Sequence, residues 1–184
     1  MSRLPEVNRD AVPQELRAAF DELISASGGE VPLGPGSVAA MSPEMALRRR
    51  PMSNYVRWEL KLSQSVQEVV ILATARAMDC RYVWNAHAPM ARRVGISDEL
   101  IDAIRDRAPL PSVTVEESAA LGLVTGMLET HDVPDEVFSA VMGQFGLQNT
   151  IDLIALIGQY VTNAGFIDSF KLELPETSEP LLPV

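Results

Sequence analysis

A chain of 184 residues, 47% hydrophobic and 22% charged, is long enough to bury the core of one soluble globular domain. Its net charge of −10 argues against binding to nucleic-acid phosphates, which needs clustered lysine and arginine side chains. Its single cysteine excludes an intramolecular disulfide and a cysteine-rich zinc site.

Helical start and stop signals organise the first third of the chain. Pro13 can begin a helix that Gly28 and Gly29 end, and a Gly- and Pro-rich loop with a short helix follows. Ser42 can cap another helix, and the segment 53–62 is a short amphipathic piece. These signals predict helices and no strands for this part.

The middle of the chain contains two apolar helical runs in succession. The spacing Ser65-x-x-Glu68 matches a capping box at the start of the first run. Asp79 can cap the second run, which Gly95 ends. If the chain reverses near Asp79, the two helices lie antiparallel.

The last third repeats the same pattern. Ser97 caps one predicted helix, and Thr114-x-x-Glu117 is a capping box for a helix that reaches Thr130. Pro134 starts a further helix, and the last one spans about 150–170. We therefore predict an all-α fold, a compact single-domain helical bundle, with an N-terminal helix and loop over 1–33, a core over 34–170 and an extended tail over 171–184.

Neither a secretory signal nor a membrane span is predicted. The first ten residues lack an apolar segment, and no apolar run approaches the length of a transmembrane helix. Two histidines and one cysteine at these separations form no recognisable set of metal ligands. We expect a cytoplasmic protein with no cofactor, no metal, no nucleic-acid partner and no membrane partner.

Glu68, Cys80 and His87 are the candidate reactive groups. Cys80 and His87 share a helix face but lie about 10 Å apart along the axis, too far for a hydrogen bond. Glu68 of an antiparallel preceding helix can approach His87 and hold its imidazole in one tautomer. At a helix N-terminus, the macrodipole would lower the pKa of the Cys80 thiol.

A purely structural interpretation of these residues is also open. In this interpretation Glu68 is a helix-capping residue, Cys80 is a small buried hydrophobic residue, and His87 is a core or interface histidine. Trp58 and Trp84 are more often core or interface anchors than cofactor platforms. Spacing alone favours this structural interpretation.

The stretch from Glu68 to His87 reads E-x11-C-x2-V-x3-H. It resembles the pattern E-x11-C-x2-C-x3-H of the alkylhydroperoxidase D-like branch of the carboxymuconolactone decarboxylase superfamily. The following run HAPMARRVGISDELIDAIRD resembles the decarboxylase-like branch, and weaker similarities extend over residues 34–176. The resemblance implies a functional His87.

Val83 is where this chain departs from both branches. The peroxidase branch carries its second cysteine at this position, and decarboxylase relatives often carry a glutamate there. With one cysteine, an intramolecular dithiol cycle is impossible. The chain is therefore a variant of either branch, nearer the decarboxylase-like one.

The resemblance implies a small-molecule enzyme that acts on a lactone or related carboxylated metabolite by proton transfer. His87 would donate the proton, Glu68 would orient it, and Cys80 is the third candidate catalytic group. The candidate substrate-binding residues are Tyr82, Val83, Trp84, Arg57 and His131, of which Arg57 or His131 would hold a carboxylate.

Two other functions remain open at this stage. The chain can be a one-cysteine thiol peroxidase, in which Cys80 reacts with the peroxide and an external thiol then reduces the oxidised cysteine. The scaffold can also be a non-catalytic ligand-binding oligomer. The resemblance further implies a homo-oligomer, commonly a trimer or hexamer.

Overall fold

The computed structural model describes residues 2–176 and 180–183, and this part of the chain is all-α. No strand occurs within these residues, as the sequence predicts. The α-helices are α1 (Arg17–Ala26), α2 (Pro35–Ala40), α3 (Pro43–Asn54), α4 (Gln64–Ala77), α5 (Arg81–Arg93), α6 (Asp98–Asp106), α7 (Val115–Thr125) and α8 (Asp135–Phe170). Short 3₁₀ turns at Arg9–Ala11 and Gln14–Leu16 precede α1, and π-helical segments follow α3 (η3, Tyr55–Glu59) and α7 (η4, Gly126–Thr130).

Side-chain caps define several helix starts. The Ser97 hydroxyl accepts a hydrogen bond from the Leu100 amide, and Thr114 and Glu117 form the predicted capping box. The predicted capping box at Ser65 and Glu68 is wrong, because α4 begins two residues earlier than that box implies, and Ser63 caps it. Glu68 therefore lies within α4 and its carboxylate is free for another partner.

The start of α5 also differs from the prediction. Cys80, not Asp79, is the residue that precedes the helix, and Asp79 takes a left-handed conformation with φ of 51°. The reversal between α4 and α5 nevertheless occurs where the sequence places it. The two helices pack against each other.

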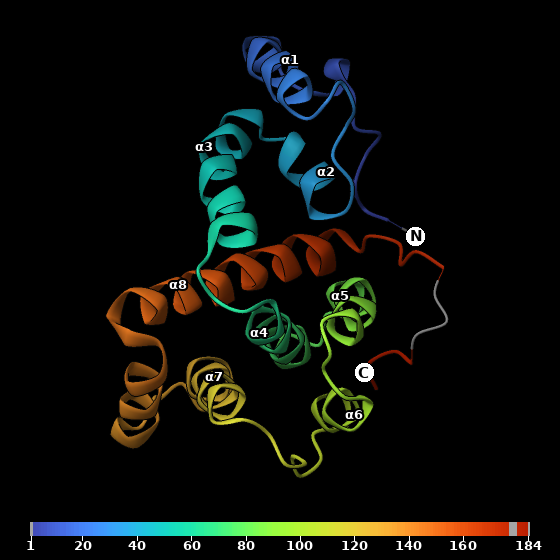
Figure 1. The fold of residues 1–184 in the computed structure, drawn as a ribbon. Coiled ribbons are helices and arrows are strands. Elements are labelled where there is room, and N and C mark those ends of the chain that lie inside the picture. The colour runs from blue at the N-terminus through green and yellow to red at the C-terminus, as the bar shows by residue number, and fades with distance from the viewer. Residues whose placement is uncertain (1, 177–179, 184) are drawn as a thin grey trace.

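Helix α8 crosses the molecule between two groups of helices (Figure 1). Helices α1, α2 and α3 lie on one side of it, and α4, α5, α6 and α7 lie on the other. The helix turns sharply at Gly146, where φ is 69° and ψ is 173°, so its two halves correspond to the two helices predicted from the sequence.

Two hydrophobic clusters occupy the interior. The larger one is built around α4, whose Val69, Val70 and Leu72 are fully buried, and it includes side chains from α5, α6, α7 and α8. The smaller one lies among the N-terminal helices and centres on Phe20 and Leu23. Phe166 of α8 packs against the smaller cluster, so α8 joins both.

By length and composition alone, α8 could cross a membrane, contrary to the expectation that no run approaches that length. Half of its most apolar window is buried inside the protein. Such burial is typical of the core helix of a folded domain.

Candidate active site

The imidazole of His87 is bound at both ring nitrogens. Its Nδ1 lies 2.8 Å from Oε2 of Glu68, and its Nε2 lies 3.2 Å from the hydroxyl of Tyr160. The Tyr160 ring meets the imidazole edge to face, with centroids 5.1 Å apart. Three helices, α4, α5 and α8, therefore meet at one histidine.

The partners determine the hydrogen-bond directions. An ionised carboxylate can only accept, so Nδ1 carries a hydrogen and donates it to Glu68. Burial raises the pKa of Tyr160 to about 12, so its phenol keeps its hydrogen at neutral pH. In the neutral imidazole, Nε2 is then an acceptor for the Tyr160 hydroxyl, and the three side chains form one directed chain.

This arrangement confirms the predicted approach of Glu68 to His87 and adds a residue that the prediction missed. Tyr160 lies 73 positions away along the chain and reaches His87 only through the packing of α8. No motif in the sequence couples the two residues.

A cavity of about 480 Å³ opens beside this chain of hydrogen bonds. Its walls come from η3, α4, α5 and α8, and its polar groups include Glu68, His87 and Tyr160. Two arginines, Arg57 and Arg93, also line it. The remaining wall is mostly apolar, as in many small-molecule sites.

Neither arginine is neutralised by an acidic side chain within the described residues. The guanidinium of Arg57 lies over the ring of Trp58, 4.8 Å from its centroid, and Arg93 donates to the Pro89 carbonyl. Both arginine side chains line the cavity and are exposed to solvent. The site can therefore attract an anion although the protein is acidic.

A smaller cavity of about 260 Å³ adjoins the first. Arg57, His87, Met90 and Tyr160 line both cavities. Tyr82 and Val83 line only the smaller one, so the structure places these two predicted residues beside His87.

Cys80 does not take part in this site. Its side chain is fully buried and lines neither cavity. Burial raises the pKa of the thiol to about 12, and the nearby Asp168 carboxylate adds to the increase. The expected lowering of the thiol pKa by the helix macrodipole is therefore wrong, because desolvation is the larger effect.

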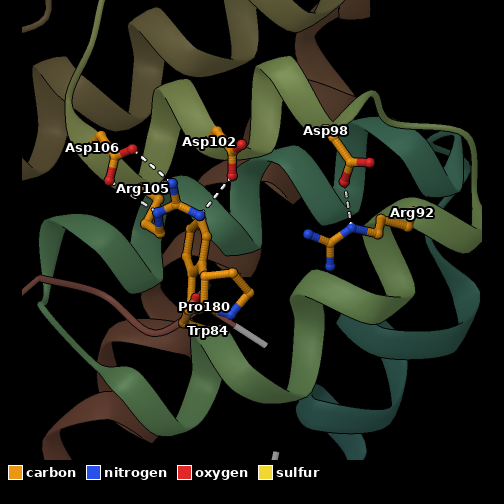
Figure 2. A network of polar contacts seen from close by, with 7 residues as sticks. All are labelled: Trp84, Arg92, Asp98, Asp102, Arg105, Asp106 and Pro180. Carbon is orange, nitrogen blue, oxygen red and sulfur yellow. Dashed lines mark hydrogen bonds and ion pairs between the residues drawn. The ribbon is translucent and has the colours of Figure 1, made fainter. Parts of the chain in front are cut away.

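Trp84 also faces away from the cavities. It is buried with Cys80, Ala88 and Ala91 on the core stripe of α5, one helical face removed from Val83 and Met90. Its indole Nε1 donates to the Pro180 carbonyl at 3.1 Å. Figure 2 shows this contact beside the ion pair of Arg92 and Asp98, which joins α5 to α6.

His131 lies outside both cavities as well. It is exposed at the end of η4 in a left-handed conformation, and its Nδ1 contacts the Met127 carbonyl. Of the two predicted carboxylate-binding residues, only Arg57 borders the site. Within the described residues, no three His, Cys, Asp or Glu side chains gather as metal ligands.

Comparisons with known proteins place the chain near one family and one fold. The model of the carboxymuconolactone decarboxylase family matches residues 43–125. Similar solved structures include a protein of unknown function of the AhpD type from Agrobacterium tumefaciens, with a TM-score of 0.65, 21% identity and coverage of 75% of this chain and 95% of that one. Residues 43–125 thus resemble the carboxymuconolactone decarboxylase family, and the solved structures share the fold of the chain.

Two further solved structures share the fold over nearly the whole chain. A peroxidase-related protein from Ralstonia eutropha with an AhpD core has a TM-score of 0.66 at 17% identity, with coverage of 95% of this chain and 93% of that one. A cysteine-to-alanine variant of the debrominase Bmp8 with 2,3,4-tribromopyrrole has a TM-score of 0.68 at 14% identity, with coverage of 95% and 94%. No curated protein matches the chain.

The superfamily match separates the site into two parts. Arg57, Glu68 and His87 lie within the matched residues 43–125, whereas Tyr160 and Asn163 lie beyond them. The carboxylate–imidazole pair thus belongs to the matched region, and α8 completes the site.

Proposed function

We propose that the chain is a small-molecule enzyme of the decarboxylase-like type, which transfers a proton to carbon in a lactone or related carboxylated metabolite. One observation carries the proposal: the hydrogen-bonded chain of Glu68, His87 and Tyr160 lies in the wall of a cavity that two arginines also line, neither of them with an acidic partner among the described residues. Proton transfer and anion binding are thus available in one place.

Arg57 and Arg93 support an anionic substrate. A guanidinium binds a carboxylate through two parallel hydrogen bonds, and both arginines lack acidic partners in the described structure. The mostly apolar wall would hold the rest of a small metabolite and keep water from the reacting carbon.

The chemistry follows from the order of the hydrogen bonds. When the bond between the carboxylate and its neighbouring carbon breaks, carbon dioxide leaves and the electron pair moves into a conjugated carbonyl, which becomes an enolate. Carbon must then take up a proton. A protonated His87 can donate through Nε2 to the Tyr160 oxygen while the phenol hydrogen passes to the substrate, and Glu68 stabilises the imidazolium.

The test is turnover of a panel of lactone carboxylates and β-keto acids by His87→Ala. We expect kcat/KM to fall by about 10²-fold or more, because general acid–base catalysis contributes at least that much. His131→Ala is the matched control, since this second histidine lies outside both cavities. Undiminished turnover by His87→Ala would remove His87 from the reaction.

The environment of Cys80 disfavours the thiol-peroxidase alternative. A peroxidatic cysteine must be an accessible thiolate, whereas this thiol is buried and its pKa is raised to about 12. Rapid alkylation of the native thiol, together with peroxide consumption that Cys80→Ser abolishes, would reverse this preference.

A non-catalytic ligand-binding role is the third possibility. It predicts that no member of the panel turns over and that a small anion co-purifies in the cavity. Mass spectrometry of the denatured protein would detect such a ligand.

We propose a cytoplasmic homo-oligomer, a trimer or hexamer, as the working assembly. Exposed apolar side chains of Leu147, Ile151 and Ile154, which recur at helical spacing on α8, support self-association. Light scattering after gel filtration would measure the mass, and a monomer at micromolar concentration would contradict the assembly.

A further inference from the structure

Asn163 of α8 presents one defined group to the smaller cavity. Its side-chain oxygen lies 2.5 Å from Nη2 of Arg49, and a guanidinium can only donate, so this atom must be the amide oxygen. The guanidinium of Arg49 is itself placed over Phe166, 5.4 Å from the ring centroid. The amide NH₂ group is therefore the part of Asn163 that remains to donate to a ligand.

Tyr82 supplies a second donor to the same cavity. Its hydroxyl oxygen would lie 2.9 Å from a Cβ atom on residue 34, so the glycine there makes room for it. Burial raises the pKa of Tyr82, and the phenol keeps its hydrogen at neutral pH. Within the described residues, this hydroxyl has no protein acceptor.

The lining of the smaller cavity contains donors and no carboxylate. Arg57, Tyr82 and Asn163 can donate to a ligand, and most of the other lining side chains are apolar. Such a cavity does not suit a cation, and it suits an oxygen atom that carries a lone pair or a developing negative charge.

We propose that the smaller cavity binds the carbonyl oxygen of the substrate, with the Asn163 amide and the Tyr82 hydroxyl as its hydrogen-bond donors. This inference rests on the proposed function and adds the two residues that would recognise the carbonyl of such a substrate. The carboxylate lies in the larger cavity near Arg57, and His87 and Tyr160 lie between the two groups.

The two donors then have a direct effect on the reaction. As the carbon–carboxylate bond breaks, the electron pair moves onto the carbonyl oxygen, and preorganised donors stabilise the charge that develops there. Removal of one such donor lowers kcat by about 10²-fold or more in comparable sites.

Binding of two matched probes tests the proposal. The probes are γ-carboxy-γ-butyrolactone and tetrahydrofuroate, which share the ring and the carboxylate and differ in the ring carbonyl oxygen. Calorimetry on the full chain should show that the lactone binds at least about 10-fold more tightly, since one good hydrogen bond is worth roughly that factor.

Single variants then assign the preference to its residues. Tyr82→Phe should reduce the preference for the lactone and leave the affinity for tetrahydrofuroate unchanged, and Asn163→Asp should weaken the binding of the lactone more than that of tetrahydrofuroate. Asn163→Asp keeps an oxygen that accepts from Arg49 but replaces the NH₂ group with an anionic oxygen, so it removes the donor to the carbonyl and also weakens the binding of both anionic probes. Arg57→Gln should weaken both probes equally, and Tyr55→Phe is the control, because its hydroxyl binds Asp152 outside both cavities.

Each contrary outcome has a separate meaning. Equal affinity of the wild type for both probes overturns the carbonyl subsite and leaves the carboxylate site standing. No binding of either probe contradicts the proposed substrate class, and the subsite fails with it. Equal weakening of both probes by Tyr82→Phe and Asn163→Asp, with unchanged melting temperatures, also overturns the subsite.

Discussion

His87 is the residue on which the site depends, because each ring nitrogen has a different partner. Glu68 accepts from Nδ1, and this leaves Nε2 to face Tyr160 and the cavities. The carboxylate thus determines which nitrogen takes part in proton transfer. The side chains are nearly buried, so water does not compete strongly for these bonds.

Replacement of Glu68 by Gln should change which ring nitrogen of the neutral His87 carries the hydrogen. The amide can donate to Nδ1 and so favours the tautomer with hydrogen on Nε2, which leaves the Tyr160 hydroxyl without an acceptor. We expect a fall of about 10²–10⁴-fold in kcat with the fold retained. Nitrogen NMR of the imidazole would report the tautomer, and Glu99→Gln on the exposed face of α6 is the control. An unchanged tautomer would contradict the assigned role.

Cys80 makes its contribution to stability rather than to chemistry. The thiol pKa is about 12 in the folded chain against an ordinary 9.0, so the unfolded chain loses its proton first as the pH rises. The associated stability is fully present below about pH 9 and is lost towards pH 12.

Urea titrations of wild type and Cys80→Ala between about pH 9 and about pH 11 would measure this effect. The unfolding free energy of the wild type should fall more steeply, by about 1.4 kcal/mol per pH unit. The variant contains the same tyrosines and lysines, so the difference between the two slopes removes their contribution to the pH dependence of the unfolding free energy. Parallel slopes would show that the thiol is not desolvated as described.

The sequence predicts only part of the site at this scale. The pairing of Glu68 with His87 follows from two adjacent helices and a short reversal, so local reasoning reaches it. Tyr160 and Asn163 come from a helix far along the chain, and only the packing of α8 brings them to the cavities. Burial likewise sets the pKa of the Cys80 thiol, and an argument from the position of Cys80 at a helix terminus takes no account of burial.

At the scale of elements, α8 depends on the conformation of one residue. Gly146 has φ of 69° and ψ of 173°, a region that is essentially limited to glycine. The Thr150 hydroxyl binds the Gly146 carbonyl at 2.7 Å and fixes the start of the second half of the helix. This half carries Tyr160 and Asn163 into the site.

Substitution of Gly146 by Ala should lower the unfolding free energy by about 1–3 kcal/mol. No atom obstructs a methyl group there, so the cost arises from the backbone alone. Gly143→Ala is the matched control, because this glycine is helical, exposed and equally unobstructed. The control should stabilise the protein by about 0.5–1 kcal/mol, and a similar gain at Gly146 would argue against the turn.

Helix boundaries show why local signals are only partly sufficient. Ser97 and the pair Thr114 and Glu117 cap their helices as predicted, because each lies directly before an apolar run. Two serines, Ser63 and Ser65, compete for the start of α4, and the motif alone selects the wrong one. The competition matters, since Glu68 serves the site only when it is not a cap.

At the scale of the whole molecule, the C-terminal segment binds the helix that carries His87. Leu182 is almost completely buried, and its carbonyl accepts from Arg81 at 3.1 Å. The Pro180 carbonyl accepts from Trp84. Residues 180–183 therefore stabilise the core-facing side of α5, whereas an adjacent face of the helix lines the cavities.

Leu182→Ala should lower the unfolding free energy by about 2–5 kcal/mol, as for other large-to-small changes in a core. Leu110→Ala, an exposed leucine, should change it by less than about 0.5 kcal/mol. Chemical denaturation of the wild type and the two variants would measure these differences in unfolding free energy. Equal stability would mean that the segment does not dock in solution.

The position of the smaller cavity at the junction of the N-terminal helices has a thermodynamic consequence. Leu33, Gly34 and Pro35 form one wall, and Asn163 and Ile167 of α8 form another. A bound molecule would touch both walls, so separation of the N-terminal helices from α8 would require its release. Binding is then linked to the free energy of this partial opening, which rises by RT ln(1 + [L]/Kd), so the N-terminal helices would gain rigidity whenever the site is occupied.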